Sequence, residues 1–228
     1  MLRHGYFDAG LTRFLVRTLR PGMCFVDLGA NMGVYTMLAA HAVGPKGKVL
    51  AVEANPELGE ILQTNILVNG LTGYAKMVSA AVAGEDGERV LHCFPRLKGS
   101  STFSAHVAEA SRAWWNEAAV AVTVPARRLE RIIEEAGIGR PDWMKIDIEG
   151  AELEALQGSA AWFKANQPRL VMEWNTGTLL GQEAALHRLL TQELGYSLRR
   201  IMPEGHSRAL LEGELERAEH FDMVAIPA

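Results

Sequence analysis

The sequence predicts an α/β fold built on a parallel sheet that helices cover on both faces. An apolar strand-like run over 23–28 ends in a turn with two glycines, and helix-like sequence follows from Met32. A second unit over 48–82 repeats the order strand, helix, strand. The strands of both units are apolar throughout instead of alternating with polar residues, as is typical of strands buried on both faces. Together these observations predict a doubly wound sheet.

The remaining elements follow from local patterns, beginning with an N-terminal helical segment within 1–20. Apolar residues recur at helical spacing over 10–19, Asp8 is available as a cap, and Pro21-Gly22 ends the helix. The predicted strands are 23–28, 48–53, 75–82, 88–94, 120–125, 142–148, 169–174, 196–201 and 221–226. The predicted helices are 10–19, 32–43, 56–69, 106–118, 129–136, 151–163 and 183–194. With 228 residues, 48% of them hydrophobic, we expect a single domain over 1–228.

Composition excludes several classes of protein. A formal net charge of −4, with basic residues scattered along the chain, argues against a nucleic-acid partner held by phosphate contacts. The two cysteines, Cys24 and Cys93, form neither a disulfide framework nor a metal-binding spacing. No apolar run reaches the roughly 18 residues that span a membrane, and the first residues lack the apolar core of a signal peptide. We therefore expect a cytoplasmic protein without a membrane partner, of unassigned oligomeric state.

The turn Asp27-Leu28-Gly29-Ala30-Asn31-Met32-Gly33 predicts a ligand site, because α/β proteins bind nucleotide-like ligands where a strand, a tight turn and a helix N-terminus meet. Gly29 has access to backbone angles closed to other residues, and Asn31 tolerates left-handed angles. A nicotinamide-binding turn has a middle glycine that admits the pyrophosphate. Asn31 takes that place here and Asp27 would repel a pyrophosphate, so a nicotinamide-dependent oxidoreductase is the disfavoured alternative.

A ligand with a cationic amino-acid end would instead gain from a nearby Asp27. S-adenosylmethionine has that end, together with a ribose whose hydroxyls need a carboxylate acceptor. Glu53 ends the second strand, 20 residues past Gly33, where such an acceptor belongs. The predicted S-adenosylmethionine site comprises Asp27, Gly29, Ala30, Asn31, Gly33, Glu53 and Ala54, with Ser79 and Ala80 bordering the adenine and Asp147 completing the set.

A second informative stretch is Lys145-Ile146-Asp147-Ile148-Glu149-Gly150-Ala151-Glu152. Lys145, Asp147 and Glu149 share one side of a strand whose other side is apolar, and three charged groups are costly to bury. We therefore place them at the carboxyl end of the strand, over the ligand crevice. Alternatively, the acids stand at the N-terminus of the next helix, where negative charge suits the helix dipole. This alternative accounts for Glu152 in part.

The acceptor-side residues are predicted less directly. Ser101 lies in a polar segment, His106 is an alternative base, and Trp114-Trp115 either stack on a sugar or aromatic acceptor or belong to a packed helix face. Glu173 and Asn175 follow a later strand and, with Asp147, offer three oxygen ligands for Mg²⁺. A strand end with a helix cap explains the same residues, and we predict no metal.

With these stretches in view, the chain resembles FkbM-type S-adenosylmethionine-dependent methyltransferases. The matching segments are Val26–Gly33, Val52–Pro56 and Lys145–Glu152, supported by Gly5–Asp8, Asn65, Asn69, Ser100–Thr102, Val122–Glu130 and Phe221–Pro227. The resemblance implies a Rossmann-like, seven-stranded class I methyltransferase sheet with its last strand antiparallel. It also implies methyl transfer, usually to oxygen, with 95–118 as a variable acceptor-side segment.

Methyl transfer to a hydroxyl needs near-attack geometry and a base for the proton. We predict Asp147, Glu149 and Lys145 as the catalytic group, with Asp147 or Glu149 acting as the base or positioning the acceptor. Ser101, His106, Trp114, Trp115 and Glu173 are the candidate substrate residues. The predicted activity is O-methylation of a hydroxyl on a small molecule, sugar or secondary metabolite. The predicted partner is therefore a small-molecule or glycan acceptor. A non-catalytic cofactor-binding protein of the same fold is the alternative.

Overall fold

The main sheet of the computed structural model, which describes residues 8–96, 98–217 and 219–228, has eight strands in the order β10-β9-β11-β8-β7-β1-β2-β3. Their bounds are β1 Cys24–Leu28, β2 Lys48–Glu53, β3 Ala75–Ser79, β7 Trp143–Ile146, β8 Arg169–Asn175, β9 Tyr196–Ile201, β10 Ser207–Ala209 and β11 His220–Pro227. The five strands from β3 to β8 are parallel, and β11 runs antiparallel to both β8 and β9. The seven expected strands are present with the last one antiparallel, and the short β10 adds an eighth at the edge.

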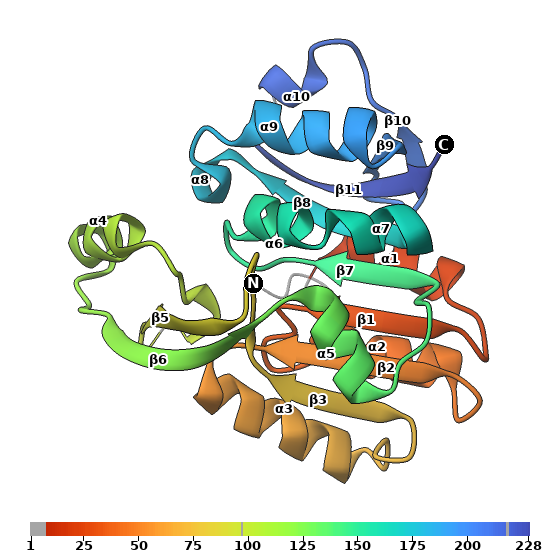
Figure 1. Cartoon of the computed structure of the whole chain (residues 1–228), viewed down its shortest axis with the longest axis horizontal. Coiled ribbons are helices and arrows are strands. Elements are labelled where there is room, and N and C mark those ends of the chain that lie inside the picture. Colours follow the sequence, from red (N-terminus) through yellow and green to blue (C-terminus); the bar gives the residue numbers. More distant parts are fainter. Residues whose placement is uncertain (1–7, 97, 218) are drawn as a thin grey trace.

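Helices cover both faces of this sheet (Figure 1). The first face carries α1 Ala9–Thr18, α2 Val34–Val43 and α3 Pro56–Val68, and the second carries α5 Leu129–Ala136, α6 Glu152–Gly158, α7 Ala160–Asn166 and α9 Glu183–Arg188. Strand β2 shows why its sequence is apolar throughout. Val49 and Ala51 pack into the core under α1–α3, whereas Leu50 and Val52 pack into the core under α5–α9. Successive side chains of a strand point to opposite faces, so both faces of the sheet are buried.

A second sheet branches from the first. The predicted strand over 75–82 divides at Ala80, so β4 Ala81–Val82 leaves the main sheet and pairs with β6 Val120–Arg127, which in turn pairs antiparallel with β5 Gly87–Cys93. The β5–β6 ribbon extends away from the main sheet and carries α4 Ala105–Trp115 near its far end (Figure 1). The expected variable segment 95–118 therefore joins these two strands.

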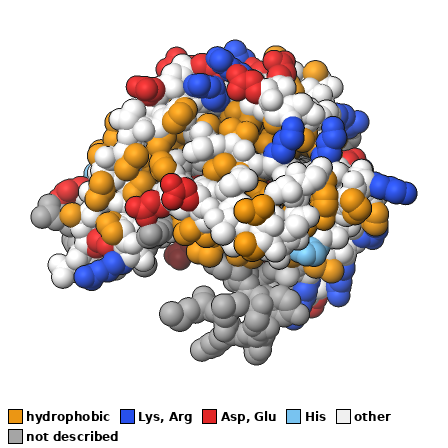
Figure 2. All heavy atoms as spheres, turned by 90° about the horizontal axis from the view of Figure 1, so that it is seen from below, with side chains coloured by type: hydrophobic (Ala, Val, Ile, Leu, Met, Phe, Trp, Pro, Cys, Tyr) orange, Lys and Arg blue, Asp and Glu red, His pale blue; other side chains and the backbone are white. Residues whose placement is uncertain are grey.

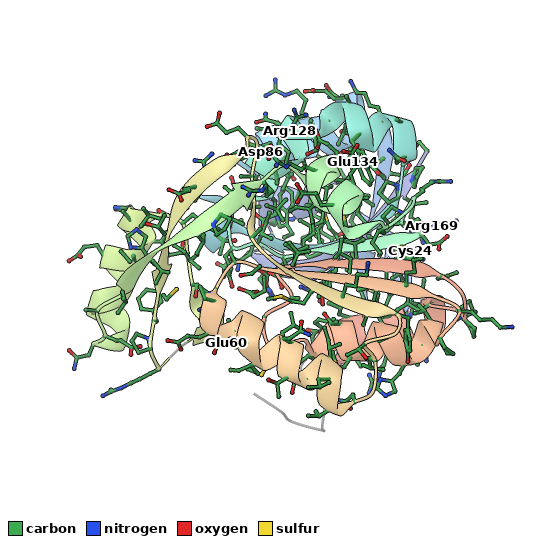
Figure 3. The ribbon with its side chains drawn as sticks, turned by 60° about the horizontal axis from the view of Figure 1, so that its bottom comes forward. Cys24, Glu60, Asp86, Arg128, Glu134 and Arg169 are labelled. Atoms are coloured by element: carbon green, nitrogen blue, oxygen red, sulfur yellow. The ribbon has the colours of Figure 1, made fainter. Side chains whose placement is uncertain are left out.

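The turn before β5 is tied to the start of α5. Asp86 accepts a hydrogen bond from the backbone N–H of Arg128 at 3.0 Å and another from the Arg131 guanidinium at 2.7 Å (Figure 3). The acceptor also stands near the positive end of the α5 dipole. This anchor fixes the root of the β5–β6 ribbon to the main sheet.

Several boundaries differ from the sequence predictions. Strand β7 ends at Ile146, so Asp147 and Ile148 lie beyond it, and the helix predicted over 151–163 is split into α6 and α7 around Ser159. The split follows Gly158, where an added Cβ would lie 2.3 Å from the Cα of Gly84. This close backbone contact leaves no room for a side chain. The prediction also missed α8 Thr176–Leu179, α10 Glu214–Arg217, the 3₁₀ turn Lys98–Ser100 and the π-helical turn Leu189–Glu193.

The surface carries no long basic stripe in the view of Figure 2, where Lys and Arg side chains lie scattered along the outline of the described part and hydrophobic and acidic side chains lie between them. Among the residues that the structure describes, no helix combines the length and apolar character needed to cross a bilayer.

Candidate functional site

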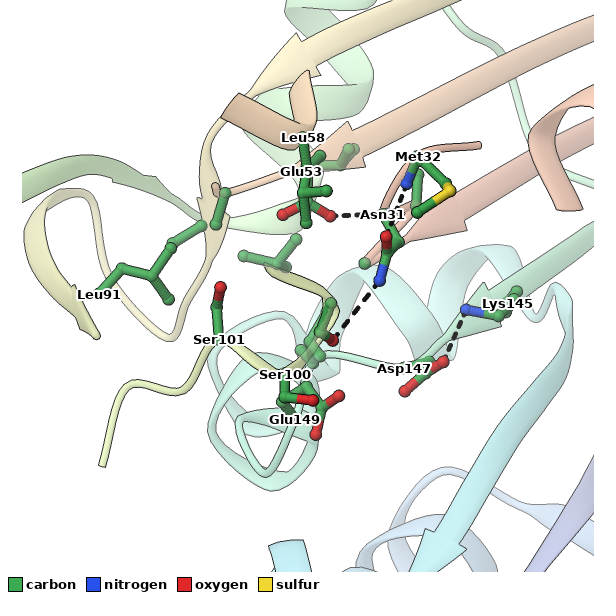
Figure 4. Close-up of a pocket in the computed structure, with 18 of the residues that line it drawn as sticks. Asn31, Met32, Glu53, Leu58, Leu91, Ser100, Ser101, Lys145, Asp147 and Glu149 are labelled. Carbon is green, nitrogen blue, oxygen red and sulfur yellow. Dashed lines mark hydrogen bonds and ion pairs between the residues drawn. The ribbon is translucent and has the colours of Figure 1, made fainter. Parts of the chain in front are cut away.

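The carboxyl ends of β1, β2, β3, β7 and β8 meet at one edge of the main sheet, and a pocket of about 660 Å³ opens there (Figure 4). That volume lies within the range of roughly 300–1,000 Å³ typical of small-molecule sites. Of the residues predicted from the sequence, the pocket is lined by Gly29, Ala30, Asn31, Glu53, Ala54, Ala80, Ser101, Lys145, Asp147, Glu149 and Glu173. Residues far apart in the sequence therefore share one cavity.

The glycine turn is shaped by close backbone contacts. Gly29 has φ +73°, and a Cβ there would lie 1.8 Å from the backbone oxygen of Asp147, so only glycine fits beside the end of β7. Asn31 has φ +53°, which confirms that asparagine takes the left-handed position in this turn. Gly33 does not line the pocket; its added Cβ would meet Leu62 of α3 at 2.5 Å. The absence of a side chain at Gly33 therefore lets α3 pack close to the turn.

Glu53 is the buried carboxylate of the pocket. Its Oε2 accepts the backbone N–H of Asn31 at 2.7 Å, and its Oε1 accepts the backbone N–H of Asn55 at 2.8 Å. Burial raises the pKa of Glu53 above its usual value, although these two N–H donors lower it. Each carboxylate oxygen has a second lone pair, so Glu53 retains the capacity to accept hydroxyl groups of a ligand.

Asp27 lies behind the pocket and does not line it. The side chain is fully buried, its Oδ2 accepts the hydroxyl of Thr36 at 2.6 Å, and its Oδ1 lies 3.6 Å from Nζ of Lys145. Lys145 is also buried, reaches the pocket and forms a 3.0 Å ion pair with Asp147. Contact between Asp27 and a cationic ligand therefore stays a prediction, and Lys145 links Asp27 to the pocket.

The protonation of Lys145 is set by its neighbours. Burial alone would lower the pKa of Lys145, but the carboxylates of Asp147 and Asp27 outweigh it and raise the pKa above its ordinary value. Lys145 is therefore a permanent cation at neutral pH and is no candidate for a base. Its geometry fixes the orientation of the Asp147 carboxylate.

Glu149 and Glu173 line the pocket near the ends of β7 and β8. Glu149 has φ +54°, an uncommon conformation for a residue other than glycine and one that is found at functional sites. Glu149 keeps solvent contact, yet packing against the protein and the nearby carboxylates of Asp147 and Glu173 raise its pKa to about 8. Glu173 is oriented by its partners: its Oε1 lies 2.6 Å from Nε2 of His220, and its Oε2 accepts the amide of Asn175.

The other predicted residues lie elsewhere. Ser79 does not line the pocket, and His106 is exposed on α4 away from it. The side chains of Trp114 and Trp115 lie outside the described part of the structure. Asn175 caps α8 by accepting the N–H of Gly177 at 3.0 Å, as the cap alternative predicted. In the described residues, no group of three or more His, Cys, Asp or Glu side chains is arranged to hold a metal ion.

The pocket also contains residues that sequence reasoning missed: Met32, Val34, Tyr35, Val52, Leu58, Ala81, Val82, Leu91, Arg96, Gly99, Ser100, Phe103 and Ile148. The apolar members come from the glycine turn, α2, β2, α3, β4 and β5, and from the segments after β5 and β7. Leu91 was predicted only as one residue of a strand, because no signal in the sequence indicates that β5 reaches the pocket. Arg96 had no sequence signal at all.

Comparisons with known proteins agree with this geometry. A family model described as the methyltransferase FkbM domain matches residues 27–198, more than half of the chain. The methyltransferase sdnD of Sordaria araneosa is 31% identical over 156 residues, which are 58% of this chain and 59% of that protein. The 31-O-demethyl-FK506 methyltransferase FkbM of Streptomyces tacrolimicus is 28% identical over 171 residues, 65% of each chain. The chain thus matches about three fifths of the length of these curated relatives.

A solved structure shows the same fold. The crystal structure of methyltransferase FkbM from Methylobacillus flagellatus KT superposes with a TM-score of 0.58 at 15% identity, covering 96% of this chain and 48% of that chain. This similarity confirms the α/β class I methyltransferase fold, with its antiparallel later strands. Fold, pocket position and family model agree, and the chain belongs to the FkbM methyltransferase family.

Proposed function

We propose that this chain catalyses S-adenosylmethionine-dependent methyl transfer to a hydroxyl group of a small molecule, sugar or secondary metabolite. Membership of the FkbM family implies binding of S-adenosylmethionine. The name of the Streptomyces relative, 31-O-demethyl-FK506 methyltransferase, describes methylation at an oxygen, which supports a hydroxyl acceptor here. The observation that carries the proposal is the buried Glu53 carboxylate in a pocket whose other end holds Asp147 and Glu149.

The pocket residues fit the cofactor. Glu53 would accept the ribose hydroxyls, the turn at Gly29–Asn31 would face the amino-acid end, and Ala80 would border the adenine. The neighbouring Ala81, Val82 and Leu58 make an apolar surface suited to an aromatic base. When bound, S-adenosylmethionine supplies an electrophilic methyl group.

The acidic side chains would accept the proton that the acceptor hydroxyl loses on methylation. A base works best when its pKa lies near the working pH, and the pKa of Glu149 is raised to about 8. We assign Glu149 as the base that takes the hydroxyl proton. Asp147, held by Lys145 at 3.0 Å, would position the acceptor by accepting a hydrogen bond from a different donor group of that molecule. Lys145 is a positioning residue in this scheme.

Calorimetric titration with S-adenosylmethionine, S-adenosylhomocysteine and NAD⁺ tests the cofactor. Binding of the first two without NAD⁺ supports the proposal, and binding of NAD⁺ alone supports the oxidoreductase. Turnover of S-adenosylmethionine with a panel of hydroxyl-bearing acceptors then separates an enzyme from a non-catalytic binding protein. Asp147→Asn and Glu149→Gln variants that bind cofactor and keep full turnover would refute the assigned roles.

A further inference from the structure

Asn31 and Asn55 make the same set of contacts on either side of Glu53. Each donates its backbone N–H to one oxygen of the Glu53 carboxylate, at 2.7 Å and 2.8 Å. Each also accepts a backbone N–H of the following turn at its own Oδ1, from Met32 and from Glu57 respectively. Both amide groups are thereby fixed in orientation, with their Nδ2 atoms directed toward residues 99–101.

Both Nδ2 atoms reach the same short segment. Asn55 Nδ2 donates to Oγ of Ser101 at 3.0 Å, and Asn31 Nδ2 lies 3.5 Å from the backbone oxygen of Gly99 (Figure 4). We call Gly99–Ser101 the strap. A Cβ at Gly99 would come within 2.9 Å of Asn31 Nδ2, so the strap lies against the glycine turn. All three strap residues line the pocket.

The strap leads directly toward α4. Thr102, the next residue, pairs with His92 of β5 through two backbone hydrogen bonds, of 2.9 Å and 3.0 Å. Ser104 then caps α4 by accepting the N–H of Val107. Phe103, between them, lines the pocket. The strap is thus separated from α4 by only three residues, Thr102, Phe103 and Ser104.

We propose that the strap couples cofactor binding to the acceptor side of the pocket, with Ser101 as the positioning residue and Asn55 as its link to Glu53. The inference rests on the proposed binding of S-adenosylmethionine. Hydroxyl groups bound by Glu53 fix the carboxylate, the two asparagines that hold it, and through them the strap. Coupling of this kind is reciprocal, so an acceptor bound against the strap strengthens cofactor binding by the same factor.

Hydrogen exchange of the whole chain, with and without S-adenosylhomocysteine, tests the coupling. In the unsubstituted protein we expect the ligand to slow exchange several-fold both in the glycine turn and in α4. In Ser101→Ala we expect slowing in the glycine turn but none in α4. Ser101→Thr retains a hydroxyl and should restore the effect on α4. Ser197→Ala removes an exposed hydroxyl on β9, outside the pocket, and should behave as the unsubstituted chain.

Two results overturn the coupling while leaving the proposed function intact. One is ligand binding to the unsubstituted chain with no change in α4, and the other is equal slowing of α4 exchange in Ser101→Ala. If calorimetry shows that the unsubstituted chain does not bind S-adenosylhomocysteine, the proposed function fails and the coupling fails with it. Calorimetry and hydrogen exchange therefore report the two failures separately.

Discussion

Lys145 neutralises Asp27 in a place that water does not reach. Its Nζ lies 3.6 Å from Oδ1 of a carboxylate with no exposed surface, and in the described structure that oxygen has no hydrogen-bond partner. The same ammonium group holds Asp147 at the pocket wall. The buried Lys145 ammonium group therefore neutralises a carboxylate in the core of the protein and also holds a carboxylate of the candidate site.

Removing this cation should be costly. Lys145→Met leaves the Asp27 charge buried and uncompensated, and breaking a buried pair from one side typically costs about 3–5 kcal/mol. We expect a loss of that order in the free energy of unfolding, measured by chemical denaturation. The double variant Asp27→Asn with Lys145→Met removes both charges and should recover much of the loss; equal instability of single and double variants would contradict the role of the pair.

Gly29→Ala should disrupt the pocket because its Cβ collides with the backbone of Asp147. Gly22 is a matched control, since it has φ +88° and no atom within 4 Å of an added Cβ. Gly22→Ala bears only the left-handed strain, about 1–2 kcal/mol. We expect Gly29→Ala to lower the thermal midpoint further and to abolish binding of S-adenosylhomocysteine by calorimetry. Similar effects of the two substitutions would argue against the close contact.

Glu53→Gln places an amide NH₂ against the N–H of Asn31 or of Asn55, because one carboxylate oxygen becomes a donor. An unsatisfied buried donor costs about 1–3 kcal/mol. We expect this loss of stability together with weaker binding of S-adenosylhomocysteine. The control is Glu60→Gln on the exposed side of α3, labelled in Figure 3, which should change neither quantity. Unaltered affinity in Glu53→Gln would remove Glu53 from the cofactor site.

The raised pKa of Glu149 predicts how stability depends on pH. Its ordinary value of 4.5 applies to the unfolded chain, and packing against the protein together with the Asp147 and Glu173 carboxylates raises the value in the folded chain to about 8. The folded state therefore holds a proton that the unfolded state releases between these values. Stability from this group is present below pH 4.5 and is lost as pH rises to about 8.

Glu149→Gln removes this dependence. Thermal midpoints of the ligand-free protein between pH 5 and pH 9 should fall more with rising pH in the unsubstituted chain than in the variant. Other groups, such as Asp222, whose pKa is raised to about 7 by burial and by Asp8 and Glu173, contribute equally to both curves. Parallel curves would show that Glu149 is not perturbed.

Local chemistry accounts for the parts of the fold that the sequence predicted. The apolar strands, the Asp8 cap of α1 and the Asn55 cap of α3 with Pro56 at its start are all readable from adjacent residues. The left-handed Asn31 was predictable for the same reason. The sequence predictions were wrong where two backbone segments that are far apart in the chain come into contact. The 151–163 helix breaks after Gly158, and the backbone of Gly158 lies against Gly84, which is 74 residues earlier in the chain.

By itself, the sequence determined the fold class, the family resemblance and one half of the candidate site, because the glycine turn and Glu53 belong to contiguous strand–turn–helix units. Tertiary structure decided the rest. It buried Asp27 behind the pocket, brought Lys145 against Asp27 and folded the Gly99–Ser101 strap onto Asn31 and Asn55. These relationships join segments separated by tens of residues, and the packing that closes such distances leaves no periodic pattern in the sequence.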